Sequence, residues 1–281
     1  MKISSIPYGL VAEKASKEGL KGIMEWVDFS ARQGLQGVEI YNNWLSYLQW
    51  EEVIALCDGI QERKLEISSY CILDFQLNCE NKEQQGKSLE YLQKLVKKSK
   101  LMNAKRLSVA SGGWGDFDMY KMSFKEAVNN TVKTLEACLP VAEENNIKII
   151  IENHPGWISR YAEALLEILE RIDSKYLELN LDTGSMFREG QRPEDFLKHE
   201  IVAKKTTSVH LKTVKFEPDP ERGRWNQLVP FEESDIDYKY IFSKLKKTGF
   251  DGWISYEMTG GGLERLSAGA KFINKMWKEI K

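Results

Sequence analysis

Four acidic or imidazole side chains in the second half of the sequence each stand at the end of an apolar segment. They are Glu152 after IKIII, Asp182 after YLELNL, His210 within TTSVHLKT and Glu257 after WISY. A carboxylate directly after a buried strand is costly unless it is paired or bound to a metal. Three carboxylates and one imidazole are ligands typical of Mn²⁺, Mg²⁺, Co²⁺ or Zn²⁺. The four residues therefore predict a site for one divalent metal ion.

Each of these residues also has a purely structural interpretation. Glu152 could cap the turn that follows it, and Glu257 stands in a similar context. Asp182 begins an Asp-Thr-Gly sequence that suits a turn, and a single buried histidine such as His210 is usually hydrogen-bonded core. Their common position at the ends of four successive predicted strands favours the metal site over these alternatives.

Alternating apolar strands and amphipathic helices predict the architecture that positions these residues. The strands are expected in KISSI (before Pro7 and Gly9), GVEIY, LEISSYCIL, KRLSVA, IKIII, YLELNL, TTSVHL and WISY. The helices are expected at Gly19–Gln33, Leu45–Lys64, Glu80–Lys100, Met122–Asn145, Arg160–Asp173, Pro193–Lys204, Ile236–Lys247 and Leu263–Ile280. A long insertion runs from Thr213 to about Asp235.

Eight strand–helix units in 281 residues amount to about 35 residues each, which favours an α/β fold built as a single (β/α)8 TIM barrel. We expect one domain over residues 1–281, since no linker or low-complexity segment divides it. A doubly wound open sheet is the alternative, but it would need a glycine-rich phosphate-binding turn after the first strand, where this chain has PYGL. In a barrel the carboxyl ends of the strands form the active site, so four adjacent strand ends would converge there.

Composition narrows the classes of function and the cellular location. The chain has 40 basic and 42 acidic residues, for a formal net charge of −2, which argues against nucleic acid as a partner. Its four cysteines form no CxxC pair, which is typical of reduced thiols. The amino terminus MKISSIPYGL has no secretory h-region, and no apolar run is long enough for a membrane span. We therefore expect a cytoplasmic protein with no membrane partner.

Several of these motifs together resemble the xylose isomerase-like superfamily of sugar isomerases and epimerases. The resemblance covers nearly the whole chain and rests on GVEIY, IIIENHPG, LNLDTG, VHLK and GFDGWISYE. It implies that Glu152, Asp182, His210 and Glu257 bind one divalent metal ion. It also implies that Glu152 and Glu257 are the catalytic acid/base groups, on opposite sides of a small sugar or sugar-phosphate substrate.

Such a set of residues suits proton transfer beside a carbonyl group. The resulting enediolate is stabilised by a metal acting as a Lewis acid, and a carboxylate can move the proton. Two carboxylates on opposite faces predict epimerisation, whereas one carboxylate serving two neighbouring carbons predicts aldose–ketose isomerisation. The expected protein is thus a metal-dependent isomerase or epimerase of carbohydrate metabolism.

Three alternatives to this function differ in chemistry. A dehydratase (lyase) acting on a polyol ketone shares the enolisation step. A non-catalytic relative would bind metal and sugar without turnover. An apurinic-site endonuclease of the same fold builds a zinc cluster from many histidines, whereas this chain has only His154, His199 and His210.

Four further residues are predicted to contact the substrate: His154, Lys212, Trp114 and Arg224. Each has a structural alternative. His154 could fix its own loop, Trp114 could pack loops together, and a loop arginine is commonly solvated. Lys212 would point away from its neighbours in a regular strand, but at a strand end it could turn inward.

Two positions depart from the pattern that the resemblance implies. Many superfamily members carry histidine where this chain has Ser185, and aspartate where it has Thr213. Both differences remove possible polar contacts, so a second metal ion is not expected and the identity of the sugar stays open. The oligomeric state, including a homo-oligomer, also stays open.

Overall fold

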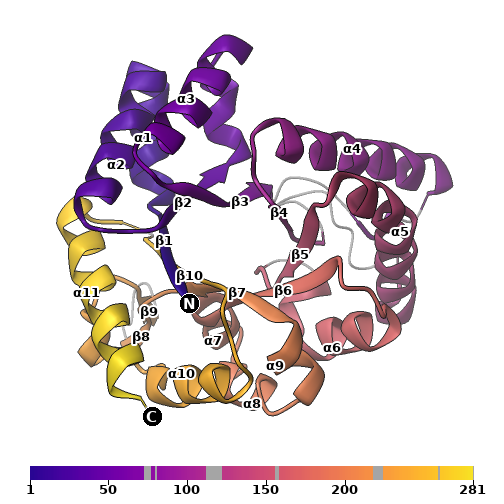
Figure 1. Cartoon of the computed structure of the whole chain (residues 1–281). Coiled ribbons are helices and arrows are strands. Elements are labelled where there is room, and N and C mark those ends of the chain that lie inside the picture. The colour runs from indigo at the N-terminus through magenta and orange to yellow at the C-terminus, as the bar shows by residue number, and fades with distance from the viewer. Residues whose placement is uncertain are drawn as a thin grey trace.

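Eight parallel strands form a nearly closed barrel in the computed structural model, which describes residues 1–72, 77–79, 81–111, 122–155, 158–217, 224–258 and 260–280 (Figure 1). The barrel strands are β1 Lys2–Ile6, β2 Gly37–Tyr41, β3 Glu66–Ile72, β4 Arg106–Val109, β5 Lys148–Glu152, β6 Leu177–Asp182, β7 Thr206–Leu211 and β10 Trp253–Glu257. Their order is β1-β10-β7-β6-β5-β4-β3-β2. The predicted (β/α)8 fold is confirmed; the single-domain boundary at residues 1–281 stays a prediction.

Two hydrogen bonds join the first and last strands of this order, β1 and β2. The backbone N–H of Gln36 donates to the carbonyl oxygen of Ile3 over 3.0 Å, and the Gln36 side-chain oxygen accepts from the Ile3 N–H over 2.9 Å. Gln36 directly precedes β2, so these bonds bring the two strands together at the seam of the barrel.

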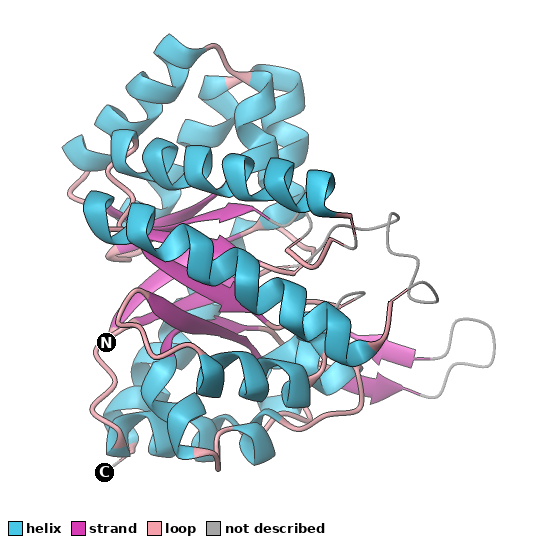
Figure 2. Ribbon diagram, turned by 90° about the vertical axis from the view of Figure 1, so that its right-hand side faces the viewer, coloured by secondary structure: helices cyan, strands magenta, loops and turns pink. Residues whose placement is uncertain are grey.

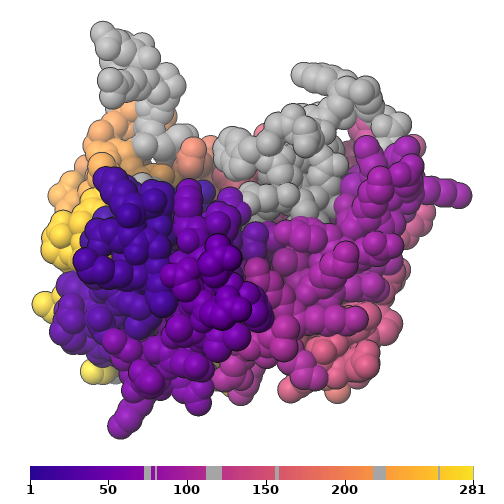
Figure 3. Space-filling view, turned by 90° about the horizontal axis from the view of Figure 1, so that it is seen from above, coloured from indigo at the N-terminus to yellow at the C-terminus, as the bar shows by residue number. Residues whose placement is uncertain are grey.

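Helices surround the sheet on its outside (Figure 1). They are α1 Tyr8–Glu18, α2 Leu20–Arg32, α3 Trp50–Glu62, α4 Lys82–Leu101, α5 Phe124–Asn145, α6 Ala162–Arg171, α7 Thr183–Arg188, α8 Pro193–Phe196, α9 Glu200–Lys205, α10 Tyr238–Lys247 and α11 Leu263–Glu279. Three short 3₁₀ helices are η1 Asn42–Tyr47, η2 Ile158–Arg160 and η3 Phe231–Glu233. Figure 3 shows α1 to α3 and α4 side by side on the outer surface, in indigo to magenta.

A small antiparallel hairpin, β8 Lys215–Glu217 and β9 Arg224–Asn226, lies within the predicted insertion after β7. Figure 2 shows that it extends from the barrel on the side opposite to the N-terminus. Because β1 begins at the N-terminus, this is the side of the carboxyl ends of the parallel strands.

The space between the sheet and the helices is mainly apolar, whereas several side chains inside the barrel are polar. On the outer side, Trp26 of α2 is fully buried and its indole N–H donates to Ser5 Oγ over 3.0 Å. On the inner side, Ser4 and Ser255 join their hydroxyl groups at 2.5 Å. Alternate residues of a strand point to opposite faces, so Ser4 points into the barrel and Ser5 points to the helices.

Helix α1 is absent from the predicted elements, because Pro7 and Gly9 suggested a loop. Pro7 has φ −80°, which suits the residue before a helix. Gly9 lies in the first turn, where its cost of about 1 kcal/mol is offset by packing further along. Val11 and Ala15 bury one face of α1 against the core.

Other predicted bounds also change. The helix expected at Leu45–Lys64 begins only at Trp50, because Gln49 and Glu52 form a capping box there and η1 precedes it. The helix expected at Pro193–Lys204 is divided into α8 and α9.

Among the described residues no helix is long and apolar enough to cross a membrane, and the four cysteines are all free thiols.

Candidate metal and catalytic site

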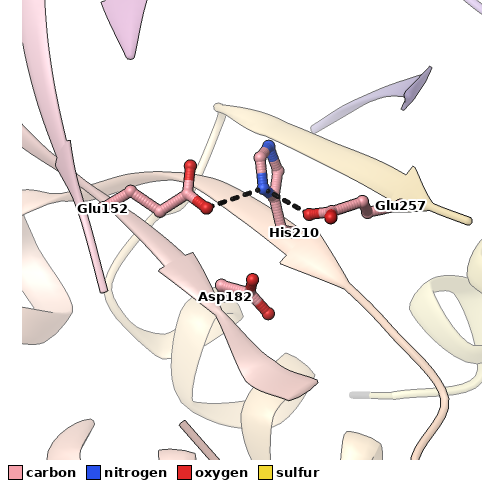
Figure 4. Close-up of side chains that lie close together, drawn as sticks. All are labelled: Glu152, Asp182, His210 and Glu257. Carbon is pink, nitrogen blue, oxygen red and sulfur yellow. Dashed lines mark ion pairs between the residues drawn. The ribbon is translucent and has the colours of Figure 1, made fainter. Parts of the chain in front are cut away.

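The four residues at the strand ends lie together at the mouth of the barrel. Glu152 ends β5, Asp182 ends β6, His210 lies near the end of β7, and Glu257 ends β10. One ligand atom from each lies within 4.8 Å of the others. Figure 4 shows the side chains of Glu152 and Glu257 pointing at His210 from opposite directions, with Asp182 beside them. Four strands that are consecutive in the sheet thus bring the set together.

The imidazole of His210 stands at the centre of this cluster and is almost fully buried. Its Nδ1 atom lies 2.8 Å from Glu257 Oε2 and 3.4 Å from Glu152 Oε1. Both contacts are ion pairs, and Nδ1 forms no hydrogen bond of regular geometry among the described residues. The opposite nitrogen, Nε2, lies 2.9 Å from Glu39 Oε1 on β2. Nδ1 is therefore the nitrogen that faces the other three ligand candidates.

The Glu152 carboxylate is held from one side. Its Oε2 accepts from Asn180 Nδ2 over 2.8 Å and from Ser108 Oγ over 3.2 Å. Both donors lie on neighbouring strands, β6 and β4. They fix one oxygen of Glu152 and leave Oε1 directed at the cluster, as a carboxylate that both binds a metal and transfers a proton requires.

Asp182 has a structural role as well as a place in the cluster. Its Oδ1 accepts from the Ser185 backbone N–H over 2.9 Å, which caps the amino end of α7. Its Oδ2 accepts from Ser185 Oγ over 2.5 Å. Asn153 holds the backbone of Asp182 by two hydrogen bonds of 2.8 Å, donating to its carbonyl and accepting from its N–H. Asp182 therefore caps the turn into α7 and also belongs to the cluster, so both interpretations of this residue apply.

Lys212, the residue after the end of β7, turns into the site. Its Nζ lies 2.6 Å from Asp182 Oδ2 and 2.8 Å from Glu257 Oε1, and the residue is only 6% exposed. Gly184 makes room for it, since a Cβ at Gly184 would lie 2.6 Å from Lys212 Cβ. The Tyr238 hydroxyl donates to the Lys212 carbonyl over 2.8 Å and fixes its backbone.

The cluster shifts the pKa values of its members. Burial alone would lower the pKa of His210, but Glu152, Glu39 and Glu257 outweigh burial and raise it well above the ordinary value. Burial alone would raise the pKa of each glutamate. His210 outweighs that effect at Glu152, and Lys212 with His210 outweighs it at Glu257, so both carboxyl pKa values lie below the ordinary value. Both glutamates are therefore ionised at neutral pH.

The pKa values of Asp182 and Lys212 are shifted in the other direction from those of the two glutamates: both are raised. Burial raises the pKa of Asp182, and Lys212 opposes this only in part. Burial would lower the pKa of Lys212, but Asp182 and Glu257 outweigh burial and raise it, so the ammonium stays charged.

These observations fit a divalent cation. The carboxylates of Glu39, Glu152, Asp182 and Glu257 outnumber the two cationic groups, so the cluster carries excess negative charge. The donors are hard oxygens and one imidazole nitrogen, and that nitrogen has no hydrogen-bond partner among the described residues. Such a donor set suits Mg²⁺, Mn²⁺, Co²⁺ or Zn²⁺.

The remaining predicted residues lie outside this cluster or outside the described residues. His154 is half-buried, two residues beyond β5, with Nδ1 3.0 Å from the Pro155 carbonyl oxygen. The backbone of Arg224 pairs with Glu217 in the hairpin, but its side chain is outside the described part of the structure. Trp114 also lies outside the described residues. Substrate contacts of these residues stay predictions.

Several residues of the site are absent from the predicted set. They are Glu39, Ser108, Asn153, Asn180 and Ser255. Glu39 and Asn180 carry a recognisable signal, because each is a polar residue inside an otherwise apolar strand, GVEIY or LELNLD. A buried charge or amide in a strand needs a partner, so it points to an organised interior.

Comparison with known proteins identifies the family of the chain. The model of the xylose isomerase-like TIM barrel family matches residues 27–276. An uncharacterized protein of Methanocaldococcus jannaschii is 29% identical over 143 residues, a match spanning 50% of this chain and 46% of the relative. The 3-dehydroshikimate dehydratase of Bacillus anthracis is 22% identical, over 83% of this chain and 84% of the relative. An inosose dehydratase of Clostridium botulinum is 22% identical, over 92% of this chain and 89% of the relative.

Solved structures share the fold. A D-tagatose 3-epimerase-like protein superposes with a TM-score of 0.75 at 24% identity, over 99% of this chain and 97% of the other. D-Psicose 3-epimerase with D-tagatose, from Clostridium cellulolyticum H10, gives 0.77 at 15% identity over 99% of both chains. The IOLI protein with a binding zinc atom gives 0.76 at 16% identity, over 100% of this chain and 99% of the other.

Proposed function

Because the chain belongs to the xylose isomerase-like TIM barrel family, we propose that it is a metal-dependent enzyme acting on a sugar or sugar phosphate. The reaction is epimerisation or aldose–ketose isomerisation, by proton transfer next to a carbonyl group. The observation that carries the proposal is the cluster of Glu152, Asp182, His210 and Glu257, of which the first three are buried and whose ligand atoms lie within 4.8 Å of one another.

The cluster would hold one divalent ion as the cofactor. Glu152 Oε1, an Asp182 oxygen, His210 Nδ1 and Glu257 Oε2 would be its protein ligands. When bound, the ion would supply Lewis-acid polarisation of the substrate carbonyl group. Lys212, with its ammonium beside Asp182 and Glu257, would donate a hydrogen bond to a substrate oxygen.

Glu152 and Glu257 are the proposed acid/base pair. They start from β5 and β10, which β6 and β7 separate in the sheet, and they point at His210 from opposite directions (Figure 4). Both are ionised at neutral pH, so either can accept the proton. Removal by one glutamate, with return to the opposite face by the other after it has taken a proton from solvent, gives the epimer, and the first glutamate then releases its proton to solvent. Return by the first glutamate to the neighbouring carbon gives the isomer.

Deuterium uptake at the substrate's α-carbon in heavy water tests the acid/base assignment. Glu152→Gln and Glu257→Gln should each abolish uptake from a panel of ketoses and ketose phosphates. Glu178→Gln is the matched control, because Glu178 is a buried glutamate at the amino end of β6, paired with Lys148 over 2.9 Å. Uptake retained in both site variants would defeat the assignment. Bound metal without uptake by the wild type would favour a non-catalytic sugar-binding protein.

Dehydration of a polyol ketone is the second candidate, and Lys212 favours it. A buried ammonium 2.8 Å from Glu257 Oε1 can give a proton to a departing hydroxyl group after Glu152 or Glu257 has removed the α-proton. Four relatives are named as dehydratases. Mass spectrometry of the product separates the two reactions, because dehydration releases one water and epimerisation leaves the mass unchanged.

A further inference from the structure

Glu39 is a buried carboxylate inside the barrel that is not one of the four ligand candidates. It lies in the middle of β2, and its side chain is 1% exposed. Oε1 lies 2.9 Å from His210 Nε2, and Oε2 accepts from Ser255 Oγ over 3.0 Å. Both oxygens are therefore engaged, one of them by the imidazole at the centre of the metal site.

This contact crosses the interior of the barrel. Strand β2 is not next to β7 in the sheet, because β1 and β10 lie between them around the seam. The neighbours of Glu39 on its own strand, Val38 and Ile40, are fully buried on the other face. These apolar side chains anchor β2 to the core, so the strand does not need the Glu39 carboxylate for its packing. A buried carboxylate is costly when unpaired, and the residue that compensates it here is His210.

The serine hydroxyl groups orient the Glu39 carboxylate. Ser4 pairs with Ser255 across β1 and β10, and Ser255 pairs with His210 across β10 and β7, so the three residues form one layer. Ser255 has a single hydroxyl proton, which it gives to Glu39, and its oxygen can accept the proton of Ser4 at 2.5 Å. Oε2 of the Glu39 carboxylate is therefore fixed by a contact that does not involve the metal ligands.

We infer that Glu39 is a positioning residue, which holds His210 with its proton on Nε2 and presents Nδ1 to the metal ion. A neutral imidazole carries one ring proton, and the acceptor beside a nitrogen decides where the proton stays. A carboxylate at Nε2 leaves the lone pair on Nδ1 and stops the ring from turning over. The inference rests on the proposed function in one respect, that the site binds a divalent ion.

Metal affinity, measured by titration calorimetry with Mn²⁺, provides the first test. Glu39→Leu removes the acceptor, and we expect it to weaken binding roughly 10- to 100-fold, the range typical of such partners. Glu39→Gln keeps the shape and one acceptor oxygen, so it should weaken binding less and stay folded if the leucine variant does not. Glu178→Gln, which removes a buried glutamate at the other end of the barrel, should leave the affinity unchanged.

A double-mutant cycle separates positioning from a general effect of charge or folding. If Glu39 acts through the ring, Glu39→Gln should cause no further loss of Mn²⁺ affinity in a His210→Ala background. The same fold-loss in both backgrounds would mean that Glu39 acts independently of His210, and would overturn the inference.

Nitrogen NMR of the three histidine rings in Zn²⁺-loaded protein reads the tautomer directly. The wild type should show a protonated Nε2 on His210, and Glu39→Leu should lose it or show a mixture of tautomers. A wild type that binds neither ion overturns the proposed function and this inference together. A wild type that binds Mn²⁺, with affinity and tautomer unchanged in both Glu39 variants, overturns the inference alone.

Discussion

The ammonium nitrogen of Lys212 lies 2.6 Å from Asp182 Oδ2, and both side chains are buried at the mouth of the barrel. The same nitrogen contacts Glu257 Oε1 at 2.8 Å. Lys212 therefore touches two of the four candidate metal ligands. This gives the lysine two opposite roles: it neutralises ligand charge that the metal ion needs, and it brings a fixed cation to the place where substrate oxygens would bind.

The two roles predict that Lys212→Met separates metal binding from turnover. Methionine keeps most of the apolar stem but removes the positive charge, so Mn²⁺ affinity should rise several-fold, because two like charges no longer compete for the same carboxylates. Deuterium uptake by substrate should fall at least about 100-fold, because the hydrogen-bond donor to the substrate is lost. Calorimetry and uptake measured on the same preparation check this, and a fall in Mn²⁺ affinity would contradict it.

Gly184 is expected to control the position of Lys212. A Cβ there would lie 2.6 Å from Lys212 Cβ and 3.1 Å from Val214 Cγ2, so Gly184→Ala should push the lysine away from Asp182. We expect a loss of about 1–3 kcal/mol in the free energy of unfolding, as for other overpacked sites, together with reduced turnover. Gly9→Ala is the control: a Cβ at Gly9 contacts nothing within 4 Å, and the variant should match or exceed wild-type stability. Equal denaturation midpoints for the two variants would contradict this packing argument.

Metal affinity should depend on pH through His210. Three surrounding glutamates raise its pKa, so the ring holds a proton on Nδ1 at pH values where a free histidine would be neutral. A metal ion must displace that proton, and its apparent affinity should therefore rise with pH by up to about tenfold per unit until the pH exceeds the pKa. Because the pKa of each of Glu152 and Glu257 is below its ordinary value, these two ligands add no pH dependence above neutrality.

Titrations at pH 6, 7 and 8 in buffers that do not bind metals measure this slope. His210→Ala, which should bind the ion more weakly, should also show a smaller slope. An affinity in the wild type that is independent of pH, or that falls as the pH rises, would show that His210 loses no proton on metal binding.

Local sequence patterns were sufficient to predict the strand ends and the side chains on them. Glu152 and Glu257 follow apolar runs whose length and composition identify buried strands, and parallel strands place their carboxyl ends on one side. The meeting of Glu152, Asp182, His210 and Glu257 follows from that rule alone. Helix α1 was missed because Pro7 and Gly9 are local signals for a loop, while packing of Val11 and Ala15 in the assembled fold decides otherwise.

Contacts across the barrel interior could not be predicted in the same way. Glu39 and His210 are 171 positions apart and meet only because the sheet closes with one particular register between β2 and β1. Alternation places Lys212 on the same inward face as His210, but its contacts with Asp182 and Glu257 depend on the neighbouring strand ends being placed beside it. Asn153 could be recognised only after β5 and β6 were placed side by side, because its partners are backbone atoms of Asp182.

The central claim is that Glu152, Asp182, His210 and Glu257 bind one divalent ion, and a crystal of Mn²⁺-loaded protein tests it most directly. Anomalous diffraction should show a single strong peak at the mouth of the barrel, about 2.0–2.3 Å from an oxygen of each carboxylate and from His210 Nδ1. No peak among these residues, or a peak bound elsewhere with Asp182 and His210 outside its ligands, would contradict the account.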